Sequence, residues 1–505
     1  MILRKGKRNM KIAQCKVNHM ENPIGYQYRH LTFSWIADCR GSLESRIVIS
    51  SAGQVVKDTG WAKLDMAATT LDVELKPRTR YEWTVAVRNE KGESITSDVN
   101  YFETGKMQEP WTAQWITTTG ANDRHPIFYH TLPDGADKKV TKARLYICGL
   151  GLYEAYLDGV KIGADWLTPG FNAYHLWVQT QTYDVTEMMQ SRPKELSILA
   201  GDGWYKSRIP FEGSSVGFYG NDYRVLAELH IEYADGSKEV LSTDESWQVR
   251  RSNITFSGIY DGEWQDDTLP QGEVEAVAIA TPLKGQLIDR LSVPVRTHEE
   301  FHPALVPNDA GETILDIGQN LAGIFTLRVH IPKGQRVHIQ AGEVLQDGHF
   351  YRDNLRTAKA EFYYTSDGEE HIVRPHFTFY GFRYLKIEGI ENFDPKDITV
   401  HALYSDMPMN SQLMTGHAKL NQFLSNVSWG MKSNFVDLPT DCPQRDERMG
   451  WTGDSQVFSE TACFLAQPYA FYRKYLYDME QEQKNADGCA PDFVPAVTCS
   501  GKGTT

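Results

Sequence analysis

The sequence has no apolar run close to the about 20 residues that a membrane-spanning helix needs. A basic cluster at residues 4–8 opens the chain, but no apolar segment of about 7 to 15 residues follows it, as a secretory signal would require. The seven cysteines form no CxxC pair, and their odd number argues against a closed disulfide framework. We therefore expect a soluble, cytoplasmic protein with reduced cysteines.

Positive charge is also scarce. The chain has 52 Lys and Arg against 66 Asp and Glu, which gives a formal net charge of -14. Nucleic acids and anionic membranes are bound through clustered Lys and Arg, so we expect neither as a partner. No phosphate-binding glycine loop, HExxH motif or His/Cys cluster is present, so we infer no cofactor and no metal ion.

Aromatic residues are plentiful, with 12 Trp and 25 Tyr in 505 residues. Such rings suit stacking on sugars. β-Sandwich proteins also place them on strands and in cores, and for any single ring that interpretation is favoured. The length exceeds what one hydrophobic core normally supports, so we expect several domains.

Three successive blocks have the pattern of β-sandwiches. In residues 1–106, alternating runs at 31–35, 45–50 and 81–89 predict a sandwich that resembles a fibronectin type III domain, whose role as a spacer is favoured over ligand binding. In residues 107–289, hairpin-like pairs at 142–159 and 224–240, the latter turning at Asp235-Gly236, predict a jelly-roll-like sandwich. In residues 290–407, strands at 312–329 and 376–389 predict a third.

Aromatic loops interrupt the second block at residues 166–174, 200–211 and 257–267. Loops on a rigid β scaffold often carry binding residues, so these loops are candidates for a sugar contact. Asp261 and Glu263 in the last loop are candidates for the same contact or for turn caps. In the third block an aromatic cluster favours a core and interface role: Phe377, Phe379, Tyr380, Phe382 and Tyr384.

The hydrophobic period becomes helical after Met407. Apolar residues recur at helical spacing within 420–431, 457–465 and 472–479, which predicts three helices in residues 408–505. Prolines and glycines interrupt the pattern, so residues 441–454 are predicted to form the loop between the first two helices.

This loop, DCPQRDERMGWTGD, concentrates charge. Cleavage of a glycosidic bond with inversion needs one carboxylic acid to protonate the leaving oxygen and a second carboxylate to activate water. Anions and an indole raise a carboxyl pKa whereas arginine lowers it, so such a loop can separate these roles. A charged helix boundary would explain the same residues without catalysis. Cys442 as a thiol nucleophile is a further alternative, but no histidine follows His417 to serve as a local base.

The string DCPQRDERMGWTGD is similar to the catalytic-domain motif of family 78 glycoside hydrolases, the bacterial α-L-rhamnosidases. Residues 167–185, 201–206, 259–266 and 316–323 resemble the accessory β domains of that family, so the resemblance covers nearly the whole chain. It implies an inverting α-L-rhamnosidase (EC 3.2.1.40) that removes terminal α-L-rhamnose. The expected fold is multidomain and mainly β, with three β-sandwiches followed by the first helices of an incomplete (α/α)6 barrel.

The resemblance also implies roles for single residues. Glu447 would be the general acid, Asp441 and Asp454 would hold rhamnosyl hydroxyls, and Arg445 and Trp451 would shape the pocket. The general base of the family is a Glu in the later part of the catalytic domain, which we expect to lie beyond the end of this chain.

The number of residues after Met407 is small for a complete barrel. Twelve helices with their connections need on the order of 190 residues, and about a hundred follow Met407. We therefore expect the 505-residue chain to be inactive and to expose apolar helix faces. Two alternatives stay open: a non-catalytic carbohydrate-binding protein, and an (α/α)6-barrel glycosidase for another sugar.

Overall fold

The structure is a computed structural model of the chain, and it describes residues 10–38, 43–120, 123–132, 138–209, 216–270 and 272–496. The basic cluster at residues 4–8, Cys39, Phe211 and Cys499 lie outside the described residues. The chain forms two compact units, Met1–Pro110 with Ile288–Leu291, and Trp111–Leu287 with Ser292–Thr505. Within the described ranges, no helix is long and apolar enough to cross a membrane.

The first unit is the predicted β-sandwich. One sheet has the order β1-β3-β6 and the other β2-β9-β7-β4-β5, with β8 beside β7. Alternate residues of β7 are buried, so its inward side chains form the core with Phe33 and Ile47. The strands are β1 (Lys11–Val17), β2 (Ile24–Tyr26), β3 (Leu31–Asp38), β4 (Leu43–Ser51), β5 (Gln54–Asp58), β6 (Thr69–Leu71), β7 (Arg80–Asn89), β8 (Ser94–Thr96) and β9 (Asn100–Thr104).

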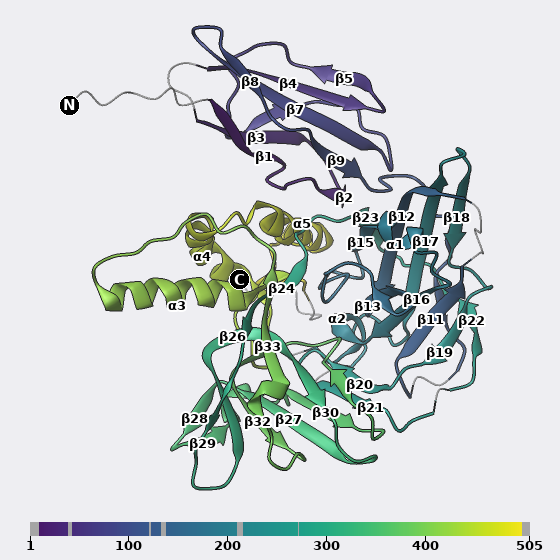
Figure 1. The fold of residues 1–505 in the computed structure, drawn as a ribbon, viewed down its shortest axis with the longest axis vertical. Coiled ribbons are helices and arrows are strands. Elements are labelled where there is room, and N and C mark those ends of the chain that lie inside the picture. The colour runs from purple at the N-terminus through teal and green to yellow at the C-terminus, as the bar shows by residue number, and fades with distance from the viewer. Residues whose placement is uncertain are drawn as a thin grey trace. The chain divides into compact units, whose positions relative to one another are not determined.

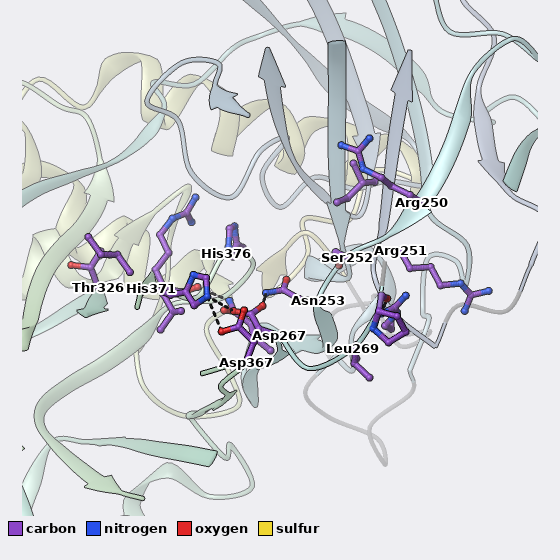
Figure 2. A pocket seen from close by; sticks show the side chains of 17 residues that line it. Arg250, Arg251, Ser252, Asn253, Asp267, Leu269, Thr326, Asp367, His371 and His376 are labelled. Atoms are coloured by element: carbon purple, nitrogen blue, oxygen red, sulfur yellow. Dashed lines mark hydrogen bonds and ion pairs between the residues drawn. The ribbon is translucent and has the colours of Figure 1, made fainter. Parts of the chain in front are cut away.

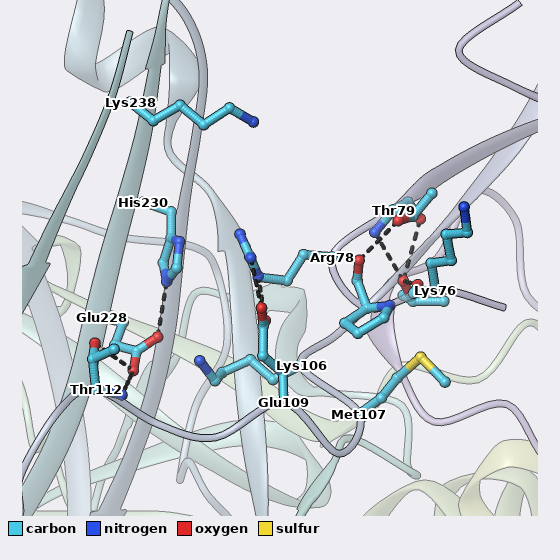
Figure 3. Close-up of polar contacts among 12 residues, drawn as sticks. Lys76, Arg78, Thr79, Lys106, Met107, Glu109, Thr112, Glu228, His230 and Lys238 are labelled. Carbon is cyan, nitrogen blue, oxygen red and sulfur yellow. Dashed lines mark hydrogen bonds and ion pairs between the residues drawn. The ribbon is translucent and has the colours of Figure 1, made fainter.

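Polar contacts tie the end of this unit together. Both carboxylate oxygens of Asp289 accept hydrogen bonds, from the backbone N–H groups of Lys106 and Met107 at 3.0 and 2.8 Å. Burial raises the pKa of Asp289 to about 6. Arg78 and Glu109 form a two-point ion pair in the same unit (Figure 3).

The second unit begins with a long path of antiparallel strands in the order β14-β13-β16-β11-β19-β22-β10-β17-β12-β15, with β18 beside β17 (Figure 1). Its elements are β10 (Ile116–Thr118), β11 (Pro126–Thr131), β12 (Val140–Leu150), β13 (Leu152–Leu157), β14 (Val160–Lys161), β15 (Trp177–Asp184), α1 (Thr186–Gln190), β16 (Glu195–Gly201), α2 (Gly203–Lys206), β17 (Arg224–Tyr233), β18 (Lys238–Ser242), β19 (Gln248–Arg251) and β22 (Glu275–Ile279). Strand β23 (Gln286–Asp289) begins in this unit and ends in the first. Glu228, fully buried on β17, accepts hydrogen bonds from the hydroxyl of Thr112 and shares one with His230 (Figure 3).

One of the two predicted hairpins in this region is wrong. β17 and β18 pair around Asp235-Gly236 as expected, but β12 and β13 do not pair with each other. β12 pairs with β15 and β17, and β13 pairs with β14 and β16. Gly151, at a φ of 96°, lies between the two strands and allows the chain to change direction without forming a hairpin.

A second sheet has the order β20-β21-β30-β27-β32-β26-β33-β24, with β25 and β31 beside β26. Residues 254–266 therefore belong to this sheet, because β21 pairs in parallel with β30. Its elements are β20 (Ile254–Gly258), β21 (Gly262–Asp266), β24 (Val295–Phe301), β25 (Ala304–Val306), β26 (Thr313–Val329), β27 (Arg336–Gly342), β28 (Val344–Gln346), β29 (His349–Tyr351), η1 (Asp353–Leu355), β30 (Glu361–Thr365), β31 (His371–Val373), β32 (Tyr380–Glu388), η2 (Pro395–Asp397) and β33 (Ile398–Ser405).

The aromatic residues of the second and third blocks lie mostly in the core. In the loops that are candidates for a sugar contact, Phe171, Trp204 and Tyr260 are each at most 3% exposed, which argues against these three rings as stacking platforms, whereas Trp166 and Trp264 are half-buried. The core role predicted for the cluster at 377–384 is confirmed for four of its members, Phe377, Phe379, Tyr380 and Phe382, each at most 1% exposed.

The three predicted helices are present, as α3 (Ala418–Asn434), α4 (Thr452–Leu465) and α5 (Tyr469–Asn485), and α3 packs on β26 and β33 (Figure 1). Short paired segments lie between and after them: β34 (Phe435–Val436), β35 (Leu438–Pro439), β36 (Gly450–Trp451) and β37 (Phe493–Val494). Several apolar residues at helical spacing face solvent, among them Phe423 at 60% and Val457 at 79% exposure. Exposed apolar helix faces were expected for an incomplete helical domain.

Candidate active site

The loop between α3 and α4 is closed by its own backbone and by one carboxylate. The N–H of Asp441 donates to the carbonyl of Met449 at 3.1 Å, and the N–H of Met449 donates to Oδ1 of Asp441 at 2.9 Å. Residues 441–449 therefore form a closed loop, which we call the catalytic loop after the role that its sequence motif predicts. Asp441 is needed to hold its shape.

Glu447 lies at the centre of this loop and is 7% exposed. Its Oε1 accepts a hydrogen bond from the indole N–H of Trp451 at 3.0 Å. Its Oε2 lies 3.0 Å from Nη2 of Arg445 and 2.9 Å from Nη1 of Arg356. The carboxyl is thus fixed by three donors, two of which carry charge.

Arg448, the next residue, points into the protein and fastens the loop to the β domains. Its guanidinium donates to the carbonyls of Ile259 and Phe379 at 2.8 and 3.0 Å, and to those of Gln444 and Arg445, both at 3.1 Å. Burial lowers the pKa of Arg448.

A second set of contacts holds the outer side of the loop. Arg208 pairs with Asp261 through two hydrogen bonds, at 2.8 and 2.9 Å, and lies 3.6 Å from Asp446. The hydroxyl of Tyr260 donates to the backbone carbonyl of Glu447 at 3.1 Å. Asp261 is therefore an ion-pair partner in this network.

Glu263 has a structural role as well. It is fully buried and accepts hydrogen bonds from the backbone N–H groups of His376 and Phe377. Burial raises its pKa. Since its oxygens are already occupied inside the protein, the expectation that Glu263 contacts a sugar is corrected.

Four of the five predicted site residues come together. Asp441, Arg445, Glu447 and Trp451 are linked by the contacts above, and Arg445 also lies 3.1 Å from Oδ2 of Asp441. Asp454 stands apart: it is exposed in the first turn of α4 instead of lying in a loop, and within the described ranges no hydrogen bond or ion pair joins it to the other four. Its carboxylate is free to meet a ligand.

Cys442 does not have the properties of a nucleophile. It is buried, and burial, with the neighbouring Asp441 opposing ionisation, raises its pKa to about 12. A reactive cysteine needs a lowered pKa. Ligand atoms of Asp441, Cys442 and Glu447 lie within 4.8 Å of one another, but a metal ion there would displace the guanidinium groups that already hold the two carboxylates.

Three residues of the site come from distant parts of the chain and were not predicted. Arg208, Tyr260 and Arg356 belong to the two β regions, and Arg356 precedes Glu447 by 91 positions. Arg208 and Tyr260 lie in two of the aromatic loops that were candidates for a sugar contact, but no motif connected them with Glu447, and no local motif marks Arg356. Their contribution depends on how the β sheets meet the catalytic loop.

A separate pocket of about 710 Å³ lies within the β regions and does not include the catalytic loop. Figure 2 shows His371 directed at Asp267 and Asp367, with ring nitrogen to carboxylate distances of 3.9 and 3.0 Å. Its arginines are also paired within the protein, Arg250 with Glu195 and Arg251 with Glu275. Most charged groups of this pocket are therefore paired within the protein, as those around Glu447 are, so charge pairing alone does not distinguish the two places.

Comparison with known proteins gives four family matches along the chain. They are the Rha78A-like N-terminal immunoglobulin domain at residues 12–108, the α-L-rhamnosidase N-terminal domain at 138–299, the bacterial α-L-rhamnosidase concanavalin-like domain at 307–404, and the bacterial α-L-rhamnosidase six-hairpin glycosidase domain at 408–505. The first sandwich is thus matched by an immunoglobulin-type family.

Full-length relatives give the same result. The chain is 31% identical to an α-L-rhamnosidase of Alteromonas sp. (strain LOR) over 94% of this chain and 56% of that protein. It is 36% identical to one of Streptomyces avermitilis over 78% of this chain and 39% of that protein. The chain spans about half the length of the curated relatives that it matches.

Solved structures are similar in fold. The α-L-rhamnosidase of Aspergillus terreus superposes with a TM-score of 0.89 at 29% identity, covering 98% of this chain and 60% of that one. The Streptomyces avermitilis enzyme complexed with L-rhamnose superposes with a TM-score of 0.87 at 25% identity, covering 97% and 66%. The domain order and the carboxylate loop define a multidomain protein of the six-hairpin glycosidase class. Within that class, the chain belongs to the α-L-rhamnosidase family.

Proposed function

We propose that this chain supplies the acid half of an active site that hydrolyses terminal α-L-rhamnosides with inversion, with Glu447 as the general acid. The observation that carries the proposal is the fixed carboxyl of Glu447, held by Trp451 on one oxygen and by Arg445 and Arg356 on the other. A general acid must be placed within hydrogen-bond reach of the oxygen that it protonates. Three donors on a fastened loop provide that placement.

The chemistry of the proposed step is as follows. Glu447 transfers its proton to the glycosidic oxygen while the bond from that oxygen to the anomeric carbon breaks, and water attacks the opposite face of the sugar. The carboxyl becomes an anion as the proton leaves, and the guanidinium groups of Arg445 and Arg356 stabilise this developing charge. The proton of the attacking water goes to a second carboxylate.

We assign the remaining site residues to the rhamnosyl unit. Asp441 and Arg445 would bind hydroxyls beside Glu447, and the exposed carboxylate of Asp454 would bind another. Trp451 would offer its ring to the apolar face of the sugar. The relative from Streptomyces avermitilis, whose structure is complexed with L-rhamnose, supports a rhamnoside as the ligand.

We also propose that the general base is not among these residues. An inverting enzyme keeps its two carboxyl groups about 6.5 to 9.5 Å apart, with room for water on the far face of the sugar. The carboxylates of Asp441 and Asp446 belong to the same loop as Glu447 and are paired with Arg445 and Arg208. Neither suits a base on the opposite face. We propose that the base is supplied by another part of the full-length protein and that the 505-residue chain alone does not turn over.

The experiment compares the 505-residue chain with a chain extended to the length of its relatives, both assayed on 4-nitrophenyl α-L-rhamnopyranoside. We expect hydrolysis by the extended chain alone, and its loss in the extended Glu447→Gln variant with rhamnose binding retained. Glu460→Gln, an exposed site on α4, is the matched control and should keep full activity. Equal turnover by the 505-residue chain would overturn the account of the missing base.

The alternatives predict other results. Binding of rhamnose without hydrolysis by the extended chain would favour a carbohydrate-binding protein. Preference for another sugar across a panel of aryl glycosides would favour a different glycosidase of the same class. Unchanged hydrolysis in Glu447→Gln would remove Glu447 from its role.

A further inference from the structure

Arg356 reaches the catalytic loop from a different domain region. It follows the short helix η1 in the sheet region, and its Nη1 lies 2.9 Å from Oε2 of Glu447. The charged and titratable groups that face Glu447 are Arg445, Asp441 and Cys442 from its own loop, Tyr260 from the turn between β20 and β21, and Arg356. Among the described residues, two arginines contact the Glu447 carboxyl: Arg445 belongs to the catalytic loop itself, and Arg356 belongs to the β region.

The backbone at Arg356 is unusual. Its φ of 58° and ψ of -115° lie in a region that residues with a Cβ atom rarely adopt. Such conformations persist where the surroundings impose them, and they occur often at functional sites. A non-glycine residue is therefore kept at a position where glycine would be less strained, which suggests that its side chain is needed.

Contacts on both sides of Arg356 fix its position. Leu355 is buried at 1% exposure, and the N–H of Lys359 donates to Asp261 at 3.2 Å. Thr357 donates its hydroxyl to Asp446 of the catalytic loop and accepts from Arg208 at its carbonyl, at 3.1 Å. The segment is thus fastened to the same network that holds the catalytic loop, while the side chain of Arg356 itself is 50% exposed.

We infer that Arg356 is a positioning residue for the proposed general acid: it holds the Glu447 carboxyl toward the leaving group and stabilises the anion left when the proton is transferred. The inference rests on the proposed function of Glu447. A guanidinium within hydrogen-bond distance makes proton donation more favourable in the transition state, because the charge that appears on the carboxyl is compensated without reorganisation. The contribution matters most where the leaving oxygen needs a proton.

The test uses the extended chain and two substrates that differ in how much the leaving oxygen depends on protonation. Methyl α-L-rhamnopyranoside has a poor leaving group that must be protonated, whereas 2,4-dinitrophenyl α-L-rhamnopyranoside has a good one that leaves without help. For Arg356→Met we expect kcat/KM to fall about 10- to 100-fold on the methyl glycoside and less than about 3-fold on the dinitrophenyl glycoside. The ratio of the two is independent of the folded fraction, so partial misfolding does not affect it.

One further readout separates this role from a structural one. Arg356→Lys keeps a cation at the site and should recover much of the ratio. The matched control is Arg352→Met in the same segment, since Arg352 pairs with Glu361 at 3.1 Å; it should leave the ratio unchanged.

The outcomes are distinguishable. Equal losses on the two substrates, or no loss on either, in an active extended chain would overturn the role of Arg356 and leave the proposed function intact. An extended chain that hydrolyses neither rhamnoside would overturn the proposed function itself. A changed ratio in Arg352→Met as large as that in Arg356→Met would also count against a specific role.

Discussion

Nζ of Lys474 lies 3.1 Å from Oδ2 of Asp437, and the carboxylate of Asp478 lies at the same distance from it. All three side chains are buried, and Asp437 also accepts the backbone N–H of Phe171 at 2.7 Å. Burial alone would lower the pKa of Lys474, but the two carboxylates raise it. The ion triad joins α5, the turn that leads to the catalytic loop, and a loop of the β region.

Replacing Lys474 by Met should therefore be severe. Two carboxylates would stay buried without their cation, which costs about 3 to 5 kcal/mol of unfolding free energy. Urea unfolding of the 505-residue chain measures the loss. Lys484→Met on the same helix is the matched control, because Lys484 is 61% exposed and its pair with Glu480 contributes at most about 1 kcal/mol. A loss in Lys474→Met no larger than in the control would contradict this account of the triad.

Lys474 also illustrates which features a sequence predicts. Helix α5 follows from apolar residues at helical spacing, and the β17–β18 hairpin follows from Asp235-Gly236, because both signals are local. The prediction that residues 142–159 form a hairpin was wrong, because β12 and β13 pair with other strands, and strand pairing depends on partners far along the chain. Lys474 likewise has the appearance of a surface lysine until Asp437 is placed beside it.

The candidate site shows the same difference between features with a local sequence signal and features that depend on contacts between distant residues. The catalytic loop was predicted from a contiguous motif, and four of the five predicted site residues do meet: Asp441, Arg445 and Glu447 in the loop, and Trp451 just after it. Asp454 was placed in the loop because Gly453 was taken as a breaker, but α4 already begins at Thr452, where a glycine in the first turn is tolerated. Arg356 and Tyr260 lie 91 and 187 positions from Glu447; the loop of Tyr260 was a candidate for a sugar contact, but no local pattern connects either residue with Glu447.

Arg448 is expected to be intolerant even of lysine. One ammonium group cannot reach the four carbonyls that the guanidinium now satisfies, so Arg448→Lys should lower the unfolding free energy by about 2 to 4 kcal/mol. It should also speed amide hydrogen exchange in the catalytic loop. Arg383→Lys is a suitable comparison, because that arginine is 40% exposed and pairs with Asp316 on the sheet. If the two variants lost similar amounts of unfolding free energy, the four carbonyl contacts of Arg448 would contribute no more to stability than an exposed ion pair does.

Glu361 should make the β region sensitive to acid. Burial alone would raise its pKa, but His338 at 3.7 Å and the hydrogen bonds from Arg352 and Tyr363 lower it to about 2, against 4.5 for an ordinary glutamate. Its stabilising effect is therefore present above about pH 4.5 and is lost as the pH falls toward 2. The stability gap between wild type and Glu361→Gln should be about 2 to 3 kcal/mol near neutral pH and should shrink in acid.

Glu343 gives a control with the opposite sign. Burial raises its pKa above 4.5, so its ionisation opposes folding and the wild type loses stability as the pH rises through this range. The gap between wild type and Glu343→Gln should then narrow with rising pH, whereas the Glu361 gap widens. Unfolding curves from pH 3 to 7, within the range set by these pKa values, compare the two. If the stability gaps of the two variants changed with pH in the same direction, the lowered pKa of Glu361 and the raised pKa of Glu343 could not both be right.

The exposed apolar side chains of the helices should make the 505-residue chain self-associate. Phe423, Val457 and Leu476 are 60%, 79% and 57% exposed, one on each helix, at positions whose spacing is that of a buried helix face. Single exposed apolar residues are normal on a soluble surface, whereas faces of several helices together promote association. Val457→Ser should therefore weaken self-association in sedimentation velocity, with a change in stability within about 0.5 kcal/mol.

Val160→Ser makes the same chemical change on strand β14, where the valine is 62% exposed, and it should leave association unchanged. If both variants reduced association equally, general surface hydrophobicity would be the cause, and the helix faces would have no special part in it.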